Sequence, residues 1–316
     1  MSGLLLFRSS ANLVLEAPHR LYSMLMNPLV RPYRFSDKRA AAALLETVWA
    51  DEKRRAADYG WVLEAAGTVQ GLGRVLKHNT IHPYVPTLDL AVLDAAYRAG
   101  HAPVLLEHLM ATFPGGTLWR IQCLESHHSA RDALEASGFA EVRRTWTPQV
   151  PLAAFPEDWL LAEARQAEAL GYRLSSERVV SEEFRAELTR AHLEHYRSTH
   201  RVNPPADLPW KTWQTIFLDD LDEVFVARRE GQLAAFASLR GAEVYWFGTL
   251  PKFAADANVL NAALKREEFK EGQSYLKTLN YELDSTDSAA LAVLSRLPVP
   301  PGEALLTFQT GIPNLA

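Results

Sequence analysis

One stretch of the sequence, residues 87–139, combines small residues and a fixed positive charge at a spacing that could bind an anion. The apolar run 87–93 predicts a buried strand, and a short turn containing Arg98 and Gly100 separates it from a helix that begins at Pro103. A strand that enters a helix through a tight turn directs several backbone N–H groups at one point, which favours phosphate or pyrophosphate. Small turn residues let the anion approach the backbone, and the arginine adds charge.

The parts that follow this turn make the pattern more specific. A second strand is predicted at 118–124 and a second helix at 129–136, with Gly138 at the position of a helix C-cap glycine. The order of these parts resembles the GNAT superfamily of N-acyltransferases. The resemblance rests on three short motifs in this order: Tyr97-Arg98-Ala99-Gly100-His101-Ala102, Leu105-Leu106 and Ser137-Gly138-Phe139.

The chain also departs from the usual pattern of that superfamily. The turn is one residue shorter and lacks two of three glycines, His127 stands where the family often has asparagine, and Leu134 replaces the frequent tyrosine acid. Because this tyrosine is missing, no residue is a candidate for the acid that would protonate the leaving thiolate.

The resemblance implies acyl transfer from a CoA thioester, with acetyl-CoA as the expected donor, to a small amine. A base must accept a proton from the substrate ammonium. Asp89 is the only carboxylate in the first strand and is therefore the candidate base, with His127 as its polar partner. The implied cofactor-binding residues are Leu90, Val92, Arg98, Ala99, Gly100, His101 and Ala102. No metal is expected.

Several plainer interpretations stay open. Asp89 alternates with apolar neighbours and could simply face solvent, and Arg98 could be a surface charge. His127 could do no more than cap a helix. His192 and His195 have a spacing that permits metal binding, but a solvated helix face is the favoured reading because no carboxylate-rich third element accompanies them.

The second half of the chain repeats the first at a spacing of roughly 150 residues, which indicates an internal duplication. A central strand is expected at 244–250, followed by a helix, a strand and a last helix. The connection at 251–260 contains no glycine, and Asp256 there would repel a phosphate. We therefore expect the second copy to be degenerate. The expected boundaries are an extension at 1–27, a first domain at 28–154, a linker helix at 155–171 and a second domain at 172–316. For the extension, two interpretations stay open: a disordered segment, or residues added by an upstream start site.

The composition is that of an ordinary globular protein. The chain has 316 residues, of which 48% are hydrophobic and 22% charged, and a net charge of −5. These values argue against nucleic acid or a membrane as the main partner. Cys123 is the only cysteine, so internal disulfides are excluded. A cytoplasmic location and a monomer or homodimer are expected.

The sequence thus predicts an α/β (α+β) chain of two tandem GNAT-like domains, each a mixed, mostly antiparallel sheet flanked by helices. The alternative function is a non-catalytic CoA- or small-molecule-binding protein built from two decayed copies. It is favoured by the short turn, the missing tyrosine and the glycine-free second connection.

Overall fold

The computed structural model describes residues 27–49, 56–76, 80–112, 118–177, 181–219, 221, 223–272 and 277–311. The predicted extension lies outside these residues, apart from Asn27. The chain forms two compact units. The first unit holds the described residues before position 78 together with Pro86–Ile121 and His127–Phe139, and the second holds the remainder. No helix among the described residues is both long and apolar enough to cross a bilayer.

The first unit is built on a mostly antiparallel sheet. Its strands, in spatial order, are β1 (Leu29–Pro32), β2 (Trp61–Ala65), β3 (Thr68–Leu76), β4 (Thr87–Val92) and the beginning of β5 (Arg120–Leu124). The β2–β3 hairpin turns at Ala66 and Gly67, both with positive φ, as a two-residue primed turn requires. β4 and β5 run parallel and pair through Thr87–Arg120 and Leu88–Ile121.

Helices cover this sheet. The helical segments are η1 (Phe35–Asp37), α2 (Lys38–Trp49), η2 (Ala56–Asp58), α3 (Asp94–Arg98), α4 (Ala102–Thr112) and α5 (His128–Ala136). α2 packs its alanine and leucine face against Val62, Leu72 and Ala91. α4 lies close to β3 because Gly73 has no side chain: a Cβ there would stand 2.6 Å from Leu109.

The second unit contains a six-stranded sheet in the order β7-β12-β11-β10-β9-β8. The bounds are β7 (Gln149–Pro151), β8 (Arg173–Glu177), β9 (Glu223–Arg229), β10 (Gln232–Arg240), β11 (Glu243–Thr249) and β12 (Thr278–Tyr281). The β9–β10 hairpin turns at Glu230 and Gly231 with positive φ at both positions, which repeats the turn of the β2–β3 hairpin. The repeated hairpin supports an internal duplication.

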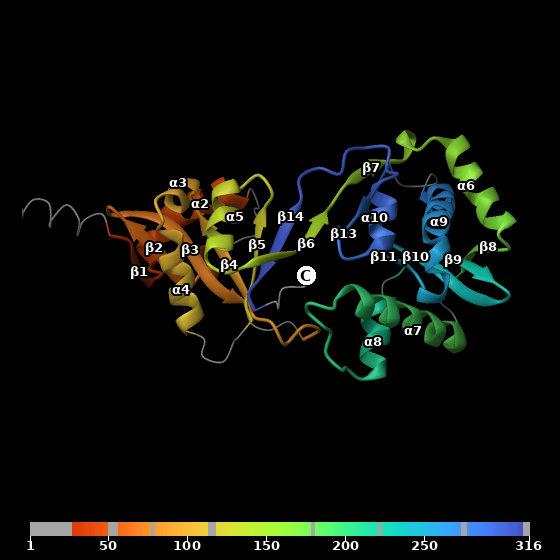
Figure 1. Cartoon of the computed structure of the whole chain (residues 1–316), viewed down its shortest axis with the longest axis horizontal. Coiled ribbons are helices and arrows are strands. Elements are labelled where there is room, and N and C mark those ends of the chain that lie inside the picture. Colours follow the sequence, from red (N-terminus) through yellow and green to blue (C-terminus); the bar gives the residue numbers. More distant parts are fainter. Residues whose placement is uncertain are drawn as a thin grey trace, which may run out of the picture. The chain divides into compact units, whose positions relative to one another are not determined.

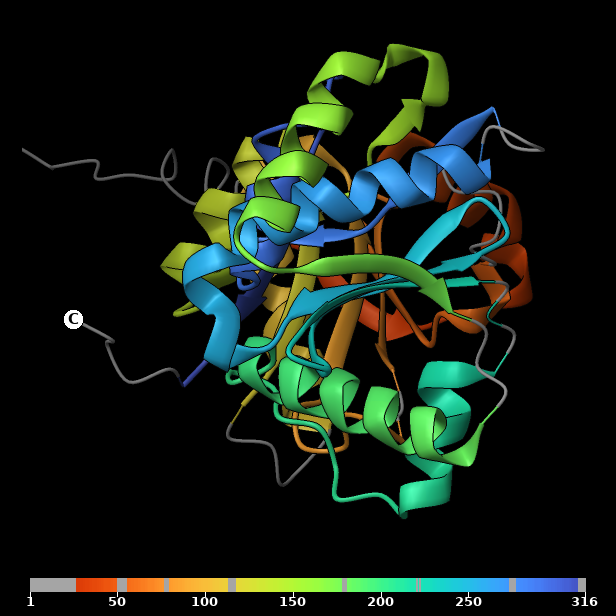
Figure 2. The same cartoon turned by 90° about the vertical axis from the view of Figure 1, so that its right-hand side faces the viewer.

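Two helical layers flank this second sheet (Figures 1 and 2). α7 (Glu182–Thr199) and α8 (Trp210–Leu218) cover one face, where Leu188, Trp213 and Phe236 belong to one core cluster. The other face carries α6 (Glu157–Ala169), α9 (Ala257–Gly272) and α10 (Ser288–Leu294), with Leu160, Leu264 and Val293 in a second cluster. The short segments η3 (Leu152–Ala154) and η4 (Pro251–Asp256) precede α6 and α9.

The ends of the two sequence halves exchange strands. From the sequence alone, residues 143–152 could complete the sheet of the first half. β6 (Ala140–Trp146) pairs there with β14 (Leu305–Gln309) and with β13 (Leu283–Asp284), but β7 pairs with β12 in the six-stranded sheet. The expectation is therefore wrong for β7. In strand order β14, the last strand of the chain, lies between β5 and β6, while β7 takes the corresponding place beside β12.

Candidate functional site

Asp89, the predicted base, is buried on β4 and does not face solvent. Its carboxylate accepts hydrogen bonds from the Tyr59 hydroxyl at 3.0 Å and from Arg74 Nε at 2.8 Å. The Arg74 side chain lies opposite Asp89 in the β3–β4 register, and its guanidinium also stands over the Tyr59 ring. These contacts hold the carboxylate firmly in one position and place an arginine beside it.

The predicted cofactor-binding residues of β4 lie in the core. Leu90 and Val92 are buried, and the Leu90 carbonyl accepts a hydrogen bond from the Trp49 indole at 3.0 Å. Their side chains therefore contribute packing. Any contact with a ligand would have to be made by the backbone.

The turn after β4 differs from its predicted form because most of it is helical. Residues Asp94–Arg98 form the short helix α3, and Gly100 follows it with φ of +73°. The N–H groups of Ala99, Gly100 and His101 donate to the carbonyls of Ala95, Tyr97 and Ala96, respectively. These three amides close the end of α3.

The side chains of this turn are also engaged. Arg98 is 70% exposed and forms an ion pair with Asp94 at 2.8 Å. The His101 ring lies 3.1 Å from the Gln70 side-chain oxygen, and Ala102 is buried at the start of α4. Helix α3 packs against α5, which begins just after His127. His127 is half-buried and makes no side-chain hydrogen bond at the helix cap.

A pocket lies in the second unit, beyond the point where the parallel strands β11 and β12 separate. β11 and β12 pair through Glu243–Asn280 and Val244–Tyr281, and the chain then leaves β12 for β13, which pairs with β6. The segments that follow the two separating strands border a pocket of about 550 Å³. The C-terminal end of α7 closes another side of it.

The pocket is lined by hydroxyl groups, small side chains and one exposed cation. Thr249, Thr286 and Ser288 contribute hydroxyl groups, and Ala254 and Ala257 leave the start of α9 unobstructed. Arg201, just after α7, is the exposed cation. These hydroxyl groups and the Arg201 cation suit a ligand that joins a polar chain to an anion.

His195 and Asp287 meet at this pocket. His195 Nε2 lies 2.9 Å from Asp287 Oδ2, and both side chains are mostly shielded from solvent, at 13% and 12% exposure. Asp287 Oδ1 accepts the Ala289 N–H at 2.8 Å and so caps α10. The imidazole lies against the backbone of Gly248 in β11: a Cβ there would stand 2.7 Å from the ring.

The sequence predicted a solvated helix face for His192 and His195. The predicted solvated histidine face is wrong, because His192 is 2% exposed and packs on Phe217 and Phe236. Burial lowers the pKa of His192 to about 3. The sequence signal that could have indicated the position of the His195 ring is Gly248, because an isolated glycine in an apolar strand often marks a close contact with the backbone.

Asp256 does not line the pocket as the sequence suggested it would. Its carboxylate accepts a hydrogen bond from the Tyr172 hydroxyl at 2.6 Å and lies 3.9 Å from Arg229. Burial, and then this hydrogen bond, raise the pKa of Tyr172. The negative charge is therefore held by partners outside the pocket.

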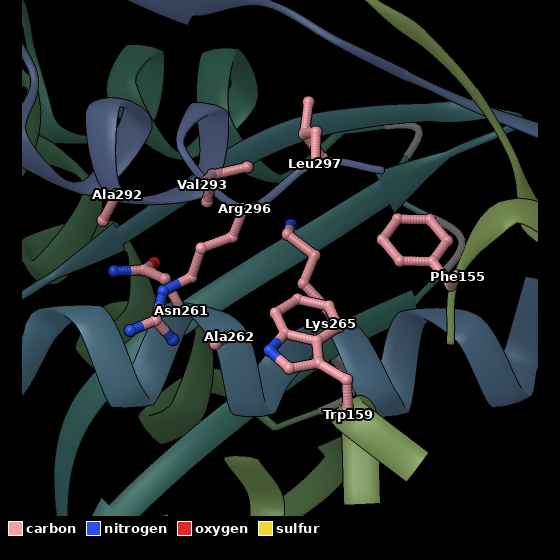
Figure 3. A pocket seen from close by; sticks show the side chains of 9 residues that line it. All are labelled: Phe155, Trp159, Asn261, Ala262, Lys265, Ala292, Val293, Arg296 and Leu297. Carbon is pink, nitrogen blue, oxygen red and sulfur yellow. The ribbon is translucent and has the colours of Figure 1, made fainter. Parts of the chain in front are cut away.

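A second, small pocket lies between α6, α9 and α10 (Figure 3). Lys265 is 4% exposed there, and its ammonium stands 4.4 Å from the Tyr281 ring centroid. Arg296 pairs with Glu163 at 2.8 Å, and Trp159 donates to the same Glu163 oxygen. These contacts join α6 to the segment that follows α10, and α9 to β12, and they indicate a structural role.

No protein-family model and no curated protein sequence matches this chain. Among solved structures, a GCN5-related N-acetyltransferase from Sphaerobacter thermophilus matches with a TM-score of 0.55 and 14% identity, over 90% of this chain and 95% of that one. A tandem GNAT protein from the clavulanic acid biosynthesis pathway matches with a TM-score of 0.48 and 14% identity, over 91% and 100%. A GCN5-related N-acetyltransferase from Kribbella flavida has a TM-score of 0.46 and 15% identity, over 78% and 88%.

The likeness to the Sphaerobacter thermophilus structure concerns the fold. This chain shares the fold of that GCN5-related N-acetyltransferase, and it has two mixed sheets flanked by helices, as the sequence predicted.

Proposed function

We propose that the protein is an acyl-CoA-dependent N-acyltransferase that acts on a small amine, with acetyl-CoA as the donor. The observation that supports this most strongly is the pocket of about 550 Å³ bordered by the segments that follow β11 and β12. The gap between separating parallel strands offers unpaired backbone groups to a ligand, and a tandem GNAT-type fold is compatible with acyl transfer.

The chemistry required there is modest. The amine must lose a proton, attack the thioester carbonyl and expel the CoA thiolate. A pocket that holds His195, Asp287 and Arg201 among hydroxyl groups and small side chains supports these steps. No residue in the pocket needs to change its covalent state.

The N-terminal residues stay part of the proposal as a separate site. Asp89 is the candidate base and His127 its polar partner, and CoA pyrophosphate would meet the exposed turn at Ala99 and Gly100. For this to happen the Arg98–Asp94 ion pair must open, since the guanidinium is already engaged.

The alternative, a non-catalytic binding protein, draws support from the N-terminal half. There the turn amides donate within α3, and Asp89 is bound by Arg74. If both halves behaved in this way, the protein would bind CoA or another small molecule without turnover.

Two matched charge reversals test which half binds CoA. Arg98→Glu places an anion at the N-terminal turn, with Arg39→Glu on α2 as its exposed control. Arg201→Glu does the same at the C-terminal pocket, with Arg190→Glu on α7 as its control. Loss of a charge-assisted contact, worth about 1.5–3 kcal/mol, corresponds to a roughly 10- to 100-fold weaker affinity in calorimetry with CoA.

The activity itself is measured as thiol release from acetyl-CoA in the presence of a panel of primary amines. Amine-dependent thiol release supports the transferase. CoA binding without any amine-dependent release supports the alternative, and absence of both CoA binding and release contradicts the two candidates together.

A further inference from the structure

We propose that His195, held by Asp287, accepts the proton of the amine substrate in the C-terminal half of the chain. This inference rests on the proposed function and assigns a working site to the half that the sequence suggests is degenerate. Three observations carry it: the position of the ring, its tautomer and the charges around it.

The first observation is the position of the ring. His195 lines the pocket from the last turns of α7 and lies flat against Gly248, near the end of β11. The ring Cγ and Nδ1 would both stand 2.7 Å from a Cβ at position 248. Only glycine permits this approach, and glycine within a strand costs roughly 0.5–1 kcal/mol of stability relative to alanine. β11 thus has a destabilising glycine, Gly248, at the position where the imidazole of His195 contacts the strand.

The second observation is the tautomer. A carboxylate has only acceptor atoms, so the His195 nitrogen beside Asp287, Nε2, carries a proton when the imidazole is neutral. Among the described residues Nδ1 has no hydrogen-bond partner. The lone pair of the neutral ring therefore resides on Nδ1, the nitrogen available to accept a proton. Asp287 is itself fixed, because its other oxygen caps α10 through Ala289.

The third observation is the set of charges around the ring. Asp287, from the start of α10, faces one edge and favours the protonated imidazole formed during the reaction. His192, one turn earlier on α7, stays neutral because burial lowers its pKa to about 3. Arg201 is the cation among the lining residues, and its exposed side chain lies beyond the end of α7.

The proton balance of the step is simple. The substrate ammonium gives one proton to His195 Nδ1, and the amine lone pair forms the new C–N bond to the thioester carbonyl. The C–S bond breaks, and the sulfur leaves with its electron pair. The second amine proton passes to the thiolate to give CoA-SH, and the imidazolium returns its proton to solvent. The products are an N-acyl amine, CoA-SH and one proton.

The structure offers matched variants for a test. His195→Gln removes the acceptor, and His128→Gln, on the exposed start of α5, is the control substitution. Asp287→Asn keeps an oxygen that can cap α10, but its amide would donate to His195 Nε2 and move the ring proton to Nδ1. Asp287 is therefore a positioning residue.

The experiment measures kcat and KM for acetyl-CoA against pH, using an amine that gives thiol release with the parent protein. His195→Gln should lower kcat by about 100-fold or more, the usual contribution of a general base, and leave KM for acetyl-CoA nearly unchanged. It should also remove the rise of the rate with pH that a general base produces. Asp287→Asn should lower kcat with the melting temperature preserved, and His128→Gln should match the parent.

Two outcomes overturn the proposal. A His195→Gln protein that keeps its rate and its pH profile shows that the base lies elsewhere, while the parent's activity still supports the proposed function. If the parent releases no thiol with any amine, NMR titration with CoA decides. The His195 Cε1–H resonance, identified by its absence in His195→Gln, should shift on CoA addition, and an unchanged resonance rejects the site.

Discussion

At the scale of single residues, the sequence identifies Asp89 but not the contacts that define its role. Tyr59 and Arg74 reach it from 30 and 15 positions away. The Arg74 contact follows from the hairpin register, in which Arg74 lies opposite Asp89. A one-residue slip in that register would place the two side chains on opposite faces, and the sequence does not determine the register of β3 and β4 this finely.

Asp89→Asn separates a structural role from a catalytic one. Loss of the carboxylate leaves Arg74 with its longer ion pair to Asp58 at 3.6 Å and its contact with the Tyr59 ring. We expect a loss of about 1–3 kcal/mol in the free energy of unfolding, measured by urea denaturation. Asp94→Asn, in an exposed pair, is the control and should cost less than about 1 kcal/mol. If Asp89 is the base of an N-terminal site, kcat will fall as well, with the acidic limb of the pH profile lost.

The His195–Asp287 pair could not be predicted from spacing. Its members are 92 positions apart and come from the end of one helix and the cap of another. Neither a local motif nor a helical period connects them. Gly248 within an apolar strand is a signal of close approach, but it does not say which residue approaches.

At the scale of elements, local rules account for the hairpins and for most helices. The Ala66-Gly67 and Glu230-Gly231 turns follow from the preference of two-residue hairpins for positive φ. The turn after β4 was harder because it contains the five-residue helix α3. A single helical turn has too few residues to show a period, and its amide bonds become visible only in three dimensions.

The burial of His192 in α7 predicts how stability depends on pH. The folded protein keeps this histidine neutral down to about pH 3, whereas an unfolded histidine is protonated below about 6.5. Its contribution to stability is fully present above pH ~6.5 and is lost as the pH falls toward 3. The slope approaches roughly 1.4 kcal/mol per pH unit.

His192→Leu should therefore weaken this dependence. Between about pH 7 and about pH 5, the variant should lose roughly 2 kcal/mol less of its free energy of unfolding than the parent. Equilibrium denaturation at the two pH values measures the difference, with His128→Leu as an exposed control. Equal losses in parent and variant would show that water or a charge satisfies the buried ring.

At the scale of the whole molecule, the sequence predicted two tandem copies but not the exchange of their last strands. β7 has only three residues, and the pattern around it is compatible with either sheet. Which sheet it joins depends on the path of the chain after Trp146, and such long-range pairing is not encoded in local periodicity.

The exchange predicts that β14 is needed for a stable fold. Residues Leu306 and Phe308 of this strand are fully buried, and it pairs with β6 along its length. A chain ended at residue 300 would leave that pairing edge and its apolar face uncovered. We expect aggregation or a melting temperature lower by about 10 °C or more. A chain ended at Gly311 keeps β14 and is the control.

Gel filtration detects aggregation of the two truncated chains, and circular dichroism measures their melting temperatures. A monomeric chain ended at residue 300 that melts like the parent would show that β14 adds little to stability. By the same argument, a fragment ending near Pro156 should fail to fold by itself, because β6 then lacks β14.

The most direct test of the central claim is a crystal structure of the protein with bound CoA. We predict electron density for the pantetheine arm in the pocket between the end of β11 and the start of α10, with the sulfur close to His195 Nδ1. Density for CoA only at the turn of Ala99 and Gly100 would move the working site to the N-terminal half. A protein that binds no CoA at either place, at concentrations well above those that saturate acyltransferases, would contradict the proposed function.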